Sequence, residues 1–348
     1  MRVVVTGATG NVGSRLVERL AADPDVEQVT GVSRREPDAL PDGVRWTPVD
    51  LADDVPAGLL AGADAVVHLA WLFQPTRDPD ATWRANVEGT ARLLREAGDA
   101  GVATFVQASS VGAYSRGPGH PVDESWPTHG IPTAAYSREK AYVERLLDAF
   151  EARHPRTRVV RLRPAFIFRQ ESAVQQRRLF GGPLAPTKLV SHLPLPVLPD
   201  PGVTLQVVHT DDVAEAYRLA LLQEVSGAFN IATDPVLDVA AIGEVLGARG
   251  VLPVPAGLTR AALAAAWAAH LVPAAPGLLD LVLQMPVMRT ERAREELGWQ
   301  PTRDAAETFR ELWRGFRSGD GGPNPPLAPG TSGRFRLHEV ATGLGRRP

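Results

Sequence analysis

The chain has 348 residues, of which 44% are hydrophobic and 22% charged, with a formal net charge of −3 and no cysteine. These values are typical of a globular protein that is long enough for one large core and a smaller lobe. The absence of cysteine excludes disulfides, cysteine-ligated zinc and thiol catalysis, and nothing in the sequence indicates another metal site. Charges of both signs are interspersed and form no basic stripe, so we expect no nucleic-acid partner.

The N-terminal residues combine a strand, a glycine-rich turn and a helix start. Residues 3–6 are mostly β-branched, and the amphipathic stretch 14–21 follows the turn. Gly7 permits a tight bend, Gly10 lets the backbone approach a diphosphate, and Gly13 lets the helix pack close to the strand. The unpaired N–H groups of the first helical turn then face the anion. This order predicts a dinucleotide-binding loop.

The end of the second expected strand, 26–32, indicates which dinucleotide binds. Units that bind NAD place an acid on the adenosine ribose about 20 residues past the loop, whereas this strand leads into Ser33, Arg34 and Arg35. Guanidinium groups bind a 2′-phosphate through charge-assisted hydrogen bonds. We therefore expect NADP in preference to NAD, with contacts from these three residues; the alternative is that both arginines are solvated loop charges.

Further apolar strands are expected at 44–49, 65–69, 104–108 and 159–162, and a helix-like stretch follows each but the last. Alternation of this kind predicts a Rossmann-type, doubly wound parallel α/β sheet. Asp50-Leu51 and Leu69-Ala70 fall at the carboxyl ends of strands, where such sheets hold ligands. We expect them to contact the cofactor, although a plain strand terminus would explain either pair.

The pattern changes beyond residue 165. A strand is expected at 205–208, a helix from 211 to about 223, another strand at 228–232, and a helical region from 238 to about 316. We therefore expect two units and a tail. They are an NAD(P)-binding domain (1–166 and 203–232), a smaller, mainly C-terminal substrate-binding lobe (167–202 and 233–316), and a flexible Gly/Pro-rich tail (317–348).

One alanine- and leucine-rich segment, 258–287, resembles a membrane span in composition only. Charged residues and prolines interrupt it, and no apolar run reaches the ~20 residues that a bilayer requires, so we expect buried or pocket-lining helices and no membrane partner. A cofactor loop that begins at Val3 leaves no room for a signal peptide. The expected location is therefore the cytoplasm.

The candidate chemistry lies between residues 109 and 140. Tyr136 and Lys140 are four residues apart in a helical stretch and therefore lie on one face. A phenol is a poor base at neutral pH, and a neighbouring Lys⁺ is expected to lower its pKa toward the working range. The Lys140 ammonium is also placed to hold the nicotinamide ribose. Ser109 and Ser110 follow strand 104–108 and bring a hydroxyl to the same place to orient the substrate C–O group.

These motifs, in this order, resemble the extended short-chain dehydrogenase/reductases, also called the NAD-dependent epimerase/dehydratase family, over residues 1–316. The matching segments are 6–13 (TGATGNVG), 50–51 (DL), 68–70 (HLA), 86–90 (NVEGT), 109–110 (SS) with Tyr114, Tyr136 with Lys140, 163–164 (RP), 209–214 (HTDDVA), 230–232 (NIA) and 293–299 (AREELGW).

The resemblance implies roles for individual residues. Tyr136 is the expected acid/base, Lys140 its electrostatic partner, and Ser110 the hydroxyl that holds the substrate, because the family's catalytic Ser/Thr stands four residues before the Tyr matched by Tyr114. Asn86 is a supporting residue or a purely structural one. The implied cofactor contacts are Gly7, Gly10, Asn11, Val12, Gly13, Asp50, Leu51, Leu69, Ala70, Asn86, Tyr136, Lys140 and Pro164.

Departures from the family pattern bear on the substrate. Sugar-nucleotide enzymes of this family usually carry an arginine shortly before the segment matched by 209–214, and here the sequence reads TLQVVH. No acidic pair follows Ser110, which disfavours dehydration. Arg177, Arg178 or Arg289 are alternative contacts for a diphosphate, or solvated side chains.

Three functions remain open at this point. The first is an NAD(P)-dependent oxidoreductase that transfers hydride to or from a carbonyl or alcohol of a small, partly apolar substrate. The second is a sugar-nucleotide epimerase with tightly bound NAD, and the third is a non-catalytic redox sensor that binds a dinucleotide. Ser110, Tyr136 and Lys140 argue against the third. The resemblance is also compatible with a homodimer through two helices at the sheet edge.

Overall fold

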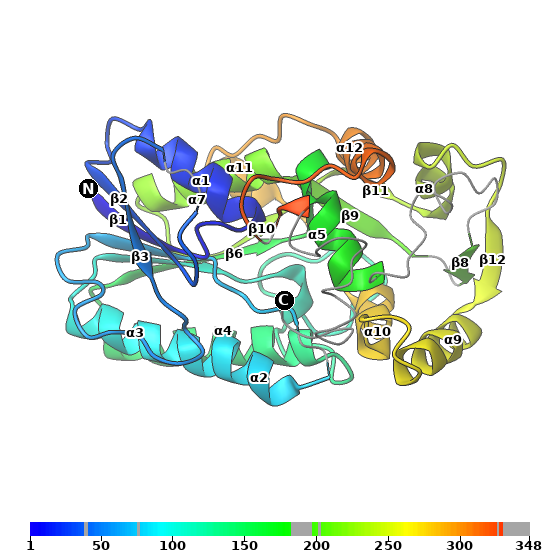
Figure 1. The fold of residues 1–348 in the computed structure, drawn as a ribbon, viewed down its shortest axis with the longest axis horizontal. Coiled ribbons are helices and arrows are strands. Elements are labelled where there is room, and N and C mark those ends of the chain that lie inside the picture. Colours follow the sequence, from blue (N-terminus) through cyan, green and yellow to red (C-terminus); the bar gives the residue numbers. More distant parts are fainter. Residues whose placement is uncertain (38–40, 75–76, 182–196, 201–202, 326, 330–348) are drawn as a thin grey trace.

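Seven short strands pair in parallel to form the main sheet of this computed structural model, which describes residues 1–348 except 38–40, 75–76, 182–196, 201–202, 326 and 330–348 (Figure 1). Their spatial order is β10-β6-β5-β4-β1-β2-β3. The strands are β1 (Arg2–Thr6), β2 (Gln28–Ser33), β3 (Val44–Pro48), β4 (Ala65–His68), β5 (Thr104–Ala108), β6 (Arg158–Pro164) and β10 (Gly227–Ile231). The sheet confirms the expected doubly wound α/β class.

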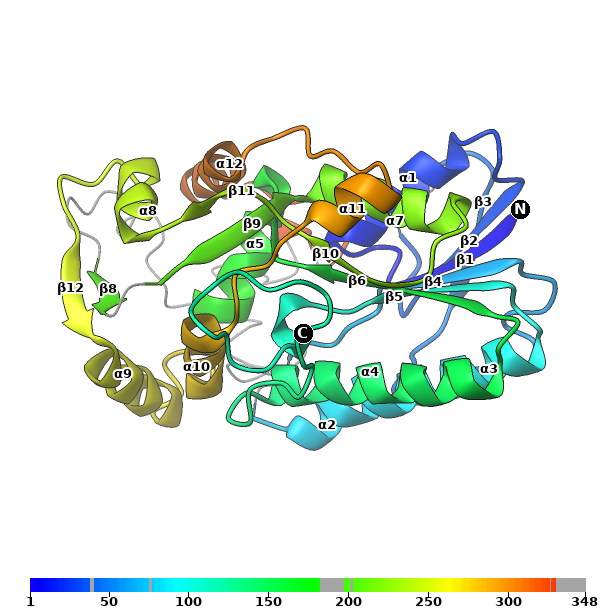
Figure 2. The same ribbon diagram turned by 180° about the vertical axis from the view of Figure 1, so that it is seen from behind.

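Helices cover both faces of this sheet, which explains why its inner strands are mostly buried. All four residues of β4 are buried, as expected for a strand that packs against helices on both sides. Three helices lie on one face and three on the other (Figures 1 and 2). They are α1 (Asn11–Ala21), α7 (Thr210–Leu222) and α11 (Glu291–Glu296), and α2 (Pro79–Trp83), α3 (Gly89–Asp99) and α4 (Ala135–Arg153).

The order of the strands reverses between β1 and β4. From β1 the chain continues to β2 and β3 on one side, and it then crosses to β4 on the other. At such a point the connections leave the carboxyl ends in opposite directions and open a crevice in which α/β proteins bind ligands. The glycine-rich turn follows β1 and therefore lies at this crevice.

A second, three-stranded sheet has the order β11-β9-β7. It comprises β7 (Phe166–Phe168), β9 (Leu205–His209) and β11 (Thr233–Leu237), with β9 parallel to β7 and antiparallel to β11. Its core contains Phe168, Val207, Leu237 and Leu312. The strand expected at 205–208 is therefore present, but it pairs outside the main sheet; the division of the chain into two units stays a prediction.

We expected the region 238–316 to be helical throughout, and the structure differs. Leu252–Pro255 forms β12, which pairs in parallel with β8 (Val197–Asp200) in a two-stranded sheet. Pro253 and Pro255 lack the N–H of a ladder donor and suit an edge strand better than a helix interior. The surrounding helices are α8 (Val239–Val245), α9 (Ala256–Ala268), α10 (Pro276–Gln284) and α12 (Ala305–Ser318).

Segment 258–287 only partly matches its prediction of buried or pocket-lining helices. α9 buries none of its residues, and Leu258 is 63% exposed, because its small alanine side chains cover a surface rather than fill a core. α10 contributes the pocket-lining residues instead. No helix in the described part of the chain is long and apolar enough to cross a membrane.

Short helical segments complete the fold, and part of the expected tail is packed. The segments are η1 (Arg84–Glu88), η2 (Val111–Ala113), η3 (Gln170–Ser172), α5 (Ala173–Gln176) and η4 (Arg177–Gly181). After α12 the chain turns back, and Leu327 is only 1% exposed. The flexibility of the tail stays a prediction, and residues 330–348 lie outside the described part of the chain.

Candidate active site

The glycine-rich turn forms a tight cradle, in which two of the three glycines leave no room for a side chain. Gly7 has φ +69°, and a Cβ there would lie 2.7 Å from the Ala70 backbone nitrogen. A Cβ on Gly13 would lie 2.2 Å from the Gly7 carbonyl oxygen. Gly10 differs, because a Cβ there would meet nothing within 4 Å except that carbonyl oxygen, at 3.1 Å. The first and third glycines therefore serve packing, and the second leaves space at the cavity.

α1 begins directly at this cradle. Its N-cap is Gly10, and no side chain caps the N–H groups of its first turn. Such N–H groups and the helix dipole favour an anion. The open space at Gly10 and these donors fit the diphosphate of a dinucleotide.

One cavity runs along the carboxyl edge of the main sheet and brings together the residues expected to be catalytic or to contact the cofactor. These residues are Gly7, Gly10, Asn11, Val12, Gly13, Ser33, Arg34, Arg35, Asp50, Leu51, Leu69, Ala70, Asn86, Ser110, Tyr136, Lys140 and Pro164. They come from the ends of β1 to β6 and from η1, α1 and α4. Their roles stay predictions, but their shared position is a property of the fold.

The end of the cavity at β2 is basic. Arg34 and Arg35 are exposed and line the cavity, and the Ser33 hydroxyl donates to the Arg35 carbonyl oxygen at 2.6 Å, which shapes the turn. Asp50 lines the same end from β3 and accepts from the Ala52 N–H at 3.1 Å. Burial raises the pKa of its carboxyl group, and the Ala52 hydrogen bond opposes that shift.

At the opposite end, Ser110 faces Tyr136. The Ser110 Oγ accepts from the Gly112 N–H at 3.0 Å. A Cβ on Gly112 would lie 3.3 Å from this Oγ and 2.7 Å from the Cε1 atom of Tyr136, so the hydroxyl lies beside the Tyr136 ring. Ser109 instead donates from its hydroxyl to Glu144, at 2.6 Å. The two adjacent serines thus point to different partners, and Ser110 is the one beside the phenol.

Lys140 lies one turn beyond Tyr136 on α4 and is only 3% exposed. Its Nζ donates to the Ala108 carbonyl oxygen at 2.7 Å and lies 3.4 Å from the centroid of the Trp71 ring. The indole face attracts the ammonium through a cation–π interaction. Burial lowers the pKa of Lys140 to about 7, although Glu139 and Glu144 oppose that shift.

The expected effect of Lys140 on the phenol is not found. Burial raises the pKa of Tyr136 to about 12, and the hydrogen bond from Ser110, rather than Lys140, opposes that shift. The Lys140 Nζ lies 5.8 Å from the centroid of the Tyr136 ring. The phenol is therefore protonated at neutral pH and suited to donate a proton.

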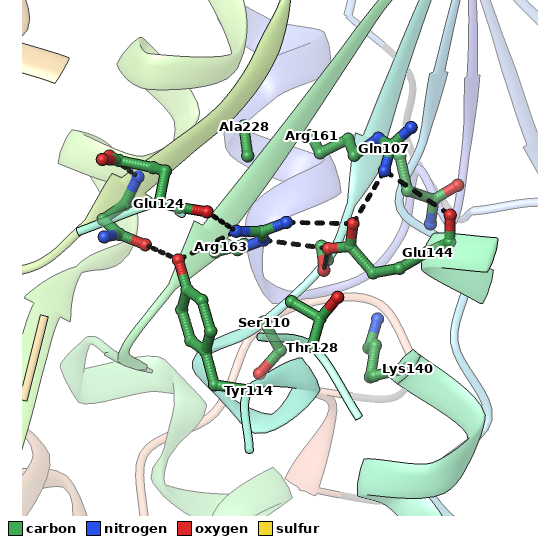
Figure 3. A network of polar contacts seen from close by, with 12 residues as sticks. Gln107, Ser110, Tyr114, Glu124, Thr128, Lys140, Glu144, Arg161, Arg163 and Ala228 are labelled. Atoms are coloured by element: carbon green, nitrogen blue, oxygen red, sulfur yellow. Dashed lines mark hydrogen bonds and ion pairs between the residues drawn. The ribbon is translucent and has the colours of Figure 1, made fainter. Parts of the chain in front are cut away.

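A buried ionic network lies behind these residues (Figure 3). Glu144, on α4, is 0% exposed and accepts from Arg161 and Arg163 of β6 at 3.0 and 2.9 Å. Arg163 also donates to the Tyr114 hydroxyl at 2.9 Å. Burial alone would raise the pKa of Glu144, but the two arginines hold it at about 2. The network joins α4 to β6 and to the segment that carries Ser110.

Asn86 acts on the backbone near the cavity. Its amide accepts from the Leu72 N–H at 2.6 Å and donates to the Leu72 carbonyl oxygen at 2.8 Å. The same amide nitrogen donates to Glu139 at 2.7 Å, and Glu139 also accepts from Thr82 at 2.6 Å. Asn86 and Glu139 therefore fix the loop that carries Trp71 and Phe73.

The sequence profile of one protein family matches residues 3–232, which include the cradle, Ser110, Tyr136 and Lys140. The chain belongs to the NAD dependent epimerase/dehydratase family. The match confirms the family inferred from the motifs.

Several curated proteins match parts of this chain. An uncharacterized protein of Mycobacterium tuberculosis (strain ATCC 25618 / H37Rv) is 26% identical over 315 residues, which are 90% of this chain and 30% of that protein. The UDP-glucose 4-epimerase of Mycolicibacterium smegmatis is 34% identical over 162 residues, 43% of this chain and 51% of that protein. The chain thus spans only 30% of the length of the first curated relatives that it matches.

Solved structures, among them that of a UDP-glucose 4-epimerase, have the same fold. MoeE5 in complex with UDP-glucose and NAD has a TM-score of 0.68 at 22% identity, covering 92% of this chain and 99% of that one. The UDP-glucose 4-epimerase of Thermotoga maritima with UDP-glucose has a TM-score of 0.68 at 20% identity, with coverages of 92% and 99%. At this level of identity the likeness concerns the fold of this epimerase/dehydratase family member.

Sequence reasoning missed the residues around Tyr136 in this family member. Trp71 and Phe73 pack on the Tyr136 ring, with centroids 5.7 and 4.8 Å away. Their signal was the aromatic spacing directly after the 68–70 motif, at the carboxyl end of β4. Of the three arginines considered for a diphosphate, Arg178 lines the cavity, whereas Arg177 and Arg289 are not among its lining residues.

Proposed function

We propose that this chain is an NADP(H)-dependent oxidoreductase that interconverts a carbonyl and an alcohol, with Tyr136 as proton donor and acceptor. The observation that carries this proposal is that Ser110, Tyr136 and Lys140 line the same cavity as the glycine cradle. The dinucleotide, when bound, supplies or accepts the hydride.

The residues of the chain transfer the proton and position the substrate. In reduction, the Tyr136 hydroxyl gives its proton to the substrate oxygen while the carbonyl carbon gains the hydride, so that C=O becomes CH–OH. Ser110 hydrogen-bonds that oxygen and the phenol. Lys140, one helical turn beyond Tyr136 on the same helix, is placed to hold the ribose.

The preference for NADP(H) rests on the basic end of the cavity. Ser33, Arg34 and Arg35 line the end of β2, the place at which NAD-binding units present an acid. The two guanidinium groups are exposed and suited to a 2′-phosphate. MoeE5 and other similar structures are described with NAD, and that cofactor is the alternative.

A second candidate function is that of a sugar-nucleotide epimerase with tightly bound NAD. The likeness to the UDP-glucose 4-epimerases favours it. It requires a site for a nucleotide diphosphate, for which Arg178 is the one cavity-lining residue among the three arginines considered.

The test is the turnover of Tyr136→Phe. We expect its kcat for carbonyl reduction, measured by the consumption of NADPH, to fall by about 10²- to 10⁴-fold. The Kd for NADPH should stay the same. Tyr142→Phe is the matched control, because Tyr142 lies on the same helix and is 46% exposed.

Near-full turnover by Tyr136→Phe would contradict the proposed mechanism. Wild-type protein that interconverts UDP-glucose and its 4-epimer without net use of NADPH would favour the epimerase. Binding of NADPH with no turnover of any carbonyl or sugar nucleotide would favour the non-catalytic sensor.

A further inference from the structure

The cavity beyond Tyr136 has an aromatic wall. Phe73 packs on the Tyr136 ring, and Phe180 packs edge-on against Phe73 with their centroids 5.8 Å apart. Trp71 closes the side toward Lys140. Aromatic rings attract other rings through offset or edge-to-face contacts. The reacting end of the cavity therefore presents ring faces and edges.

Another part of the wall is aliphatic. Leu278, Leu281, Val282 and Met285 of α10 and its C-terminal end line the cavity. Leu281 and Met285 belong to the same apolar cluster as the Tyr136 ring. A flat apolar group beside Tyr136 would thus meet both aromatic and aliphatic side chains.

Two amide side chains that line the cavity, those of Asn86 and Gln74, donate to or accept from the protein backbone. Both atoms of the Asn86 amide bind the Leu72 backbone, and the Gln74 Nε2 donates to the Arg178 carbonyl oxygen at 3.1 Å. A sugar ring carries several hydroxyls and needs free partners for them. Gln175 and Gln176 of α5 also line the cavity and suit one or two polar substituents.

Phe180 remains 36% exposed although it lines the cavity. An exposed aromatic ring gains free energy when an apolar surface covers it. A nucleotide diphosphate would instead bring at least two negative charges to this end, and Arg178 is the only charged side chain that the described lining residues of α5, η4 and α10 contribute.

We propose that the substrate is an aryl carbonyl or the corresponding aryl alcohol, and this inference rests on the oxidoreductase function proposed above. Its ring packs against Phe73, Phe180 and the α10 wall, which directs the attached C–O group toward Tyr136 and Ser110. In reduction, the carbonyl carbon receives a hydride from NADPH, the oxygen receives the Tyr136 proton, and the products are the aryl alcohol and NADP⁺. A proton from solvent then restores Tyr136.

The test compares aldehydes and ketones that differ only in the ring. The probes are benzaldehyde, 4-hydroxybenzaldehyde and acetophenone, each beside its cyclohexyl counterpart, with NADPH and the full chain. We expect kcat/KM to be about three- to tenfold higher for the aryl member of each pair, the range that one aromatic contact provides.

The variant Phe180→Leu tests whether the aromatic wall of the cavity causes the preference for aryl probes. The variant keeps an apolar side chain at a half-exposed position and should fold as the wild type does, which circular dichroism checks. We expect the aryl-to-cyclohexyl ratio of kcat/KM to fall toward one. Tyr142→Leu, an exposed ring outside the cavity, should leave the ratio at its wild-type value.

The outcomes separate the two proposals. Equal use of aryl and cyclohexyl probes, or an unchanged ratio in Phe180→Leu, overturns the aryl inference and leaves the oxidoreductase function standing. If the protein binds NADPH but consumes it with neither class of probe, both the aryl inference and the oxidoreductase function are overturned.

Discussion

At the scale of single residues, the three glycines of the cradle have different physical tasks although they belong to one motif. We expect Gly10→Val to abolish dinucleotide binding and leave the protein folded, because the new side chain would occupy the space open to the cavity. Isothermal titration with NADPH and NAD, beside a thermal unfolding curve, measures both effects.

Gly13→Val provides the contrast within the same loop. Its Cβ would lie 2.2 Å from the Gly7 carbonyl oxygen, so the backbone itself must move and the melting temperature should fall. If Gly10→Val kept wild-type affinity with a normal melting curve, the loop would be a turn without a binding role.

The arginines at β2 decide between the two cofactors. We expect joint replacement of Arg34 and Arg35 by alanine to weaken NADPH far more than NADH, because each charged hydrogen bond lost to the 2′-phosphate is worth about 1.5–3 kcal/mol. Joint replacement of Arg153 and Arg156, which are exposed at and beyond the end of α4, removes the same charge outside the cavity. Equal losses of affinity for NADPH and NADH in a titration would exclude a phosphate contact.

At the scale of elements, Glu144 joins α4 to β6 through two buried arginines. We expect Glu144→Gln to lower the free energy of unfolding by about 3–5 kcal/mol, because Arg163 loses its buried charge partner and Arg161 keeps only the partly exposed Asp148 and Glu151. Glu151→Gln is the control: Glu151 pairs with the same Arg161 but is half-exposed, and surface pairs contribute only about 0–1 kcal/mol. Urea denaturation of the three proteins measures the difference, and equal losses would contradict the argument.

The same network has a defined pH dependence. The pKa of Glu144 is about 2 in the folded protein and 4.5 in its ordinary state. Its stabilisation is therefore complete above pH 4.5 and is lost as the pH falls toward 2. In that range the stability of Glu144→Gln should decline less steeply than that of the wild type.

Local patterns carried most of what the sequence could predict about these elements. Apolar runs predict the strands of the main sheet, and glycines three residues apart predict the turn. Each of these elements could therefore be predicted without knowledge of the segments that pack against it. Ser110, Tyr136 and Lys140 were placed by their motifs. β12 was missed because a short apolar segment with two prolines becomes a strand only through its partner β8.

Contacts between distant segments could not be predicted in the same way. Trp71 reaches Lys140, and Asn86 holds Leu72 and Glu139, only after β4, η1 and α4 have packed together. The high pKa of Tyr136 has the same origin, because burial is a property of the assembled cavity and not of the Tyr-Lys spacing. The motifs therefore predict which residues belong to the site, whereas the packing of distant segments determines their contacts and pKa values.

At the scale of the whole molecule, the cavity combines two kinds of construction. Its dinucleotide end is built from the carboxyl ends of β1 to β4, which are local in sequence, whereas its aromatic end also needs η4 and α10, far along the chain. The first end can therefore stay similar across proteins of one fold while the second changes with the substrate.

The chain alternates between its two larger sheets, and this has a consequence for its synthesis. β6 leads into β7 of the small sheet, β9 follows, and only then does β10 return to close the main sheet beside β6. A nascent chain that has not reached Gly227 therefore leaves β6 as an open edge, a template for pairing with other chains. Because β10 ends at Ile231 and β11 begins at Thr233, both sheets gain their last strand at nearly the same moment of translation.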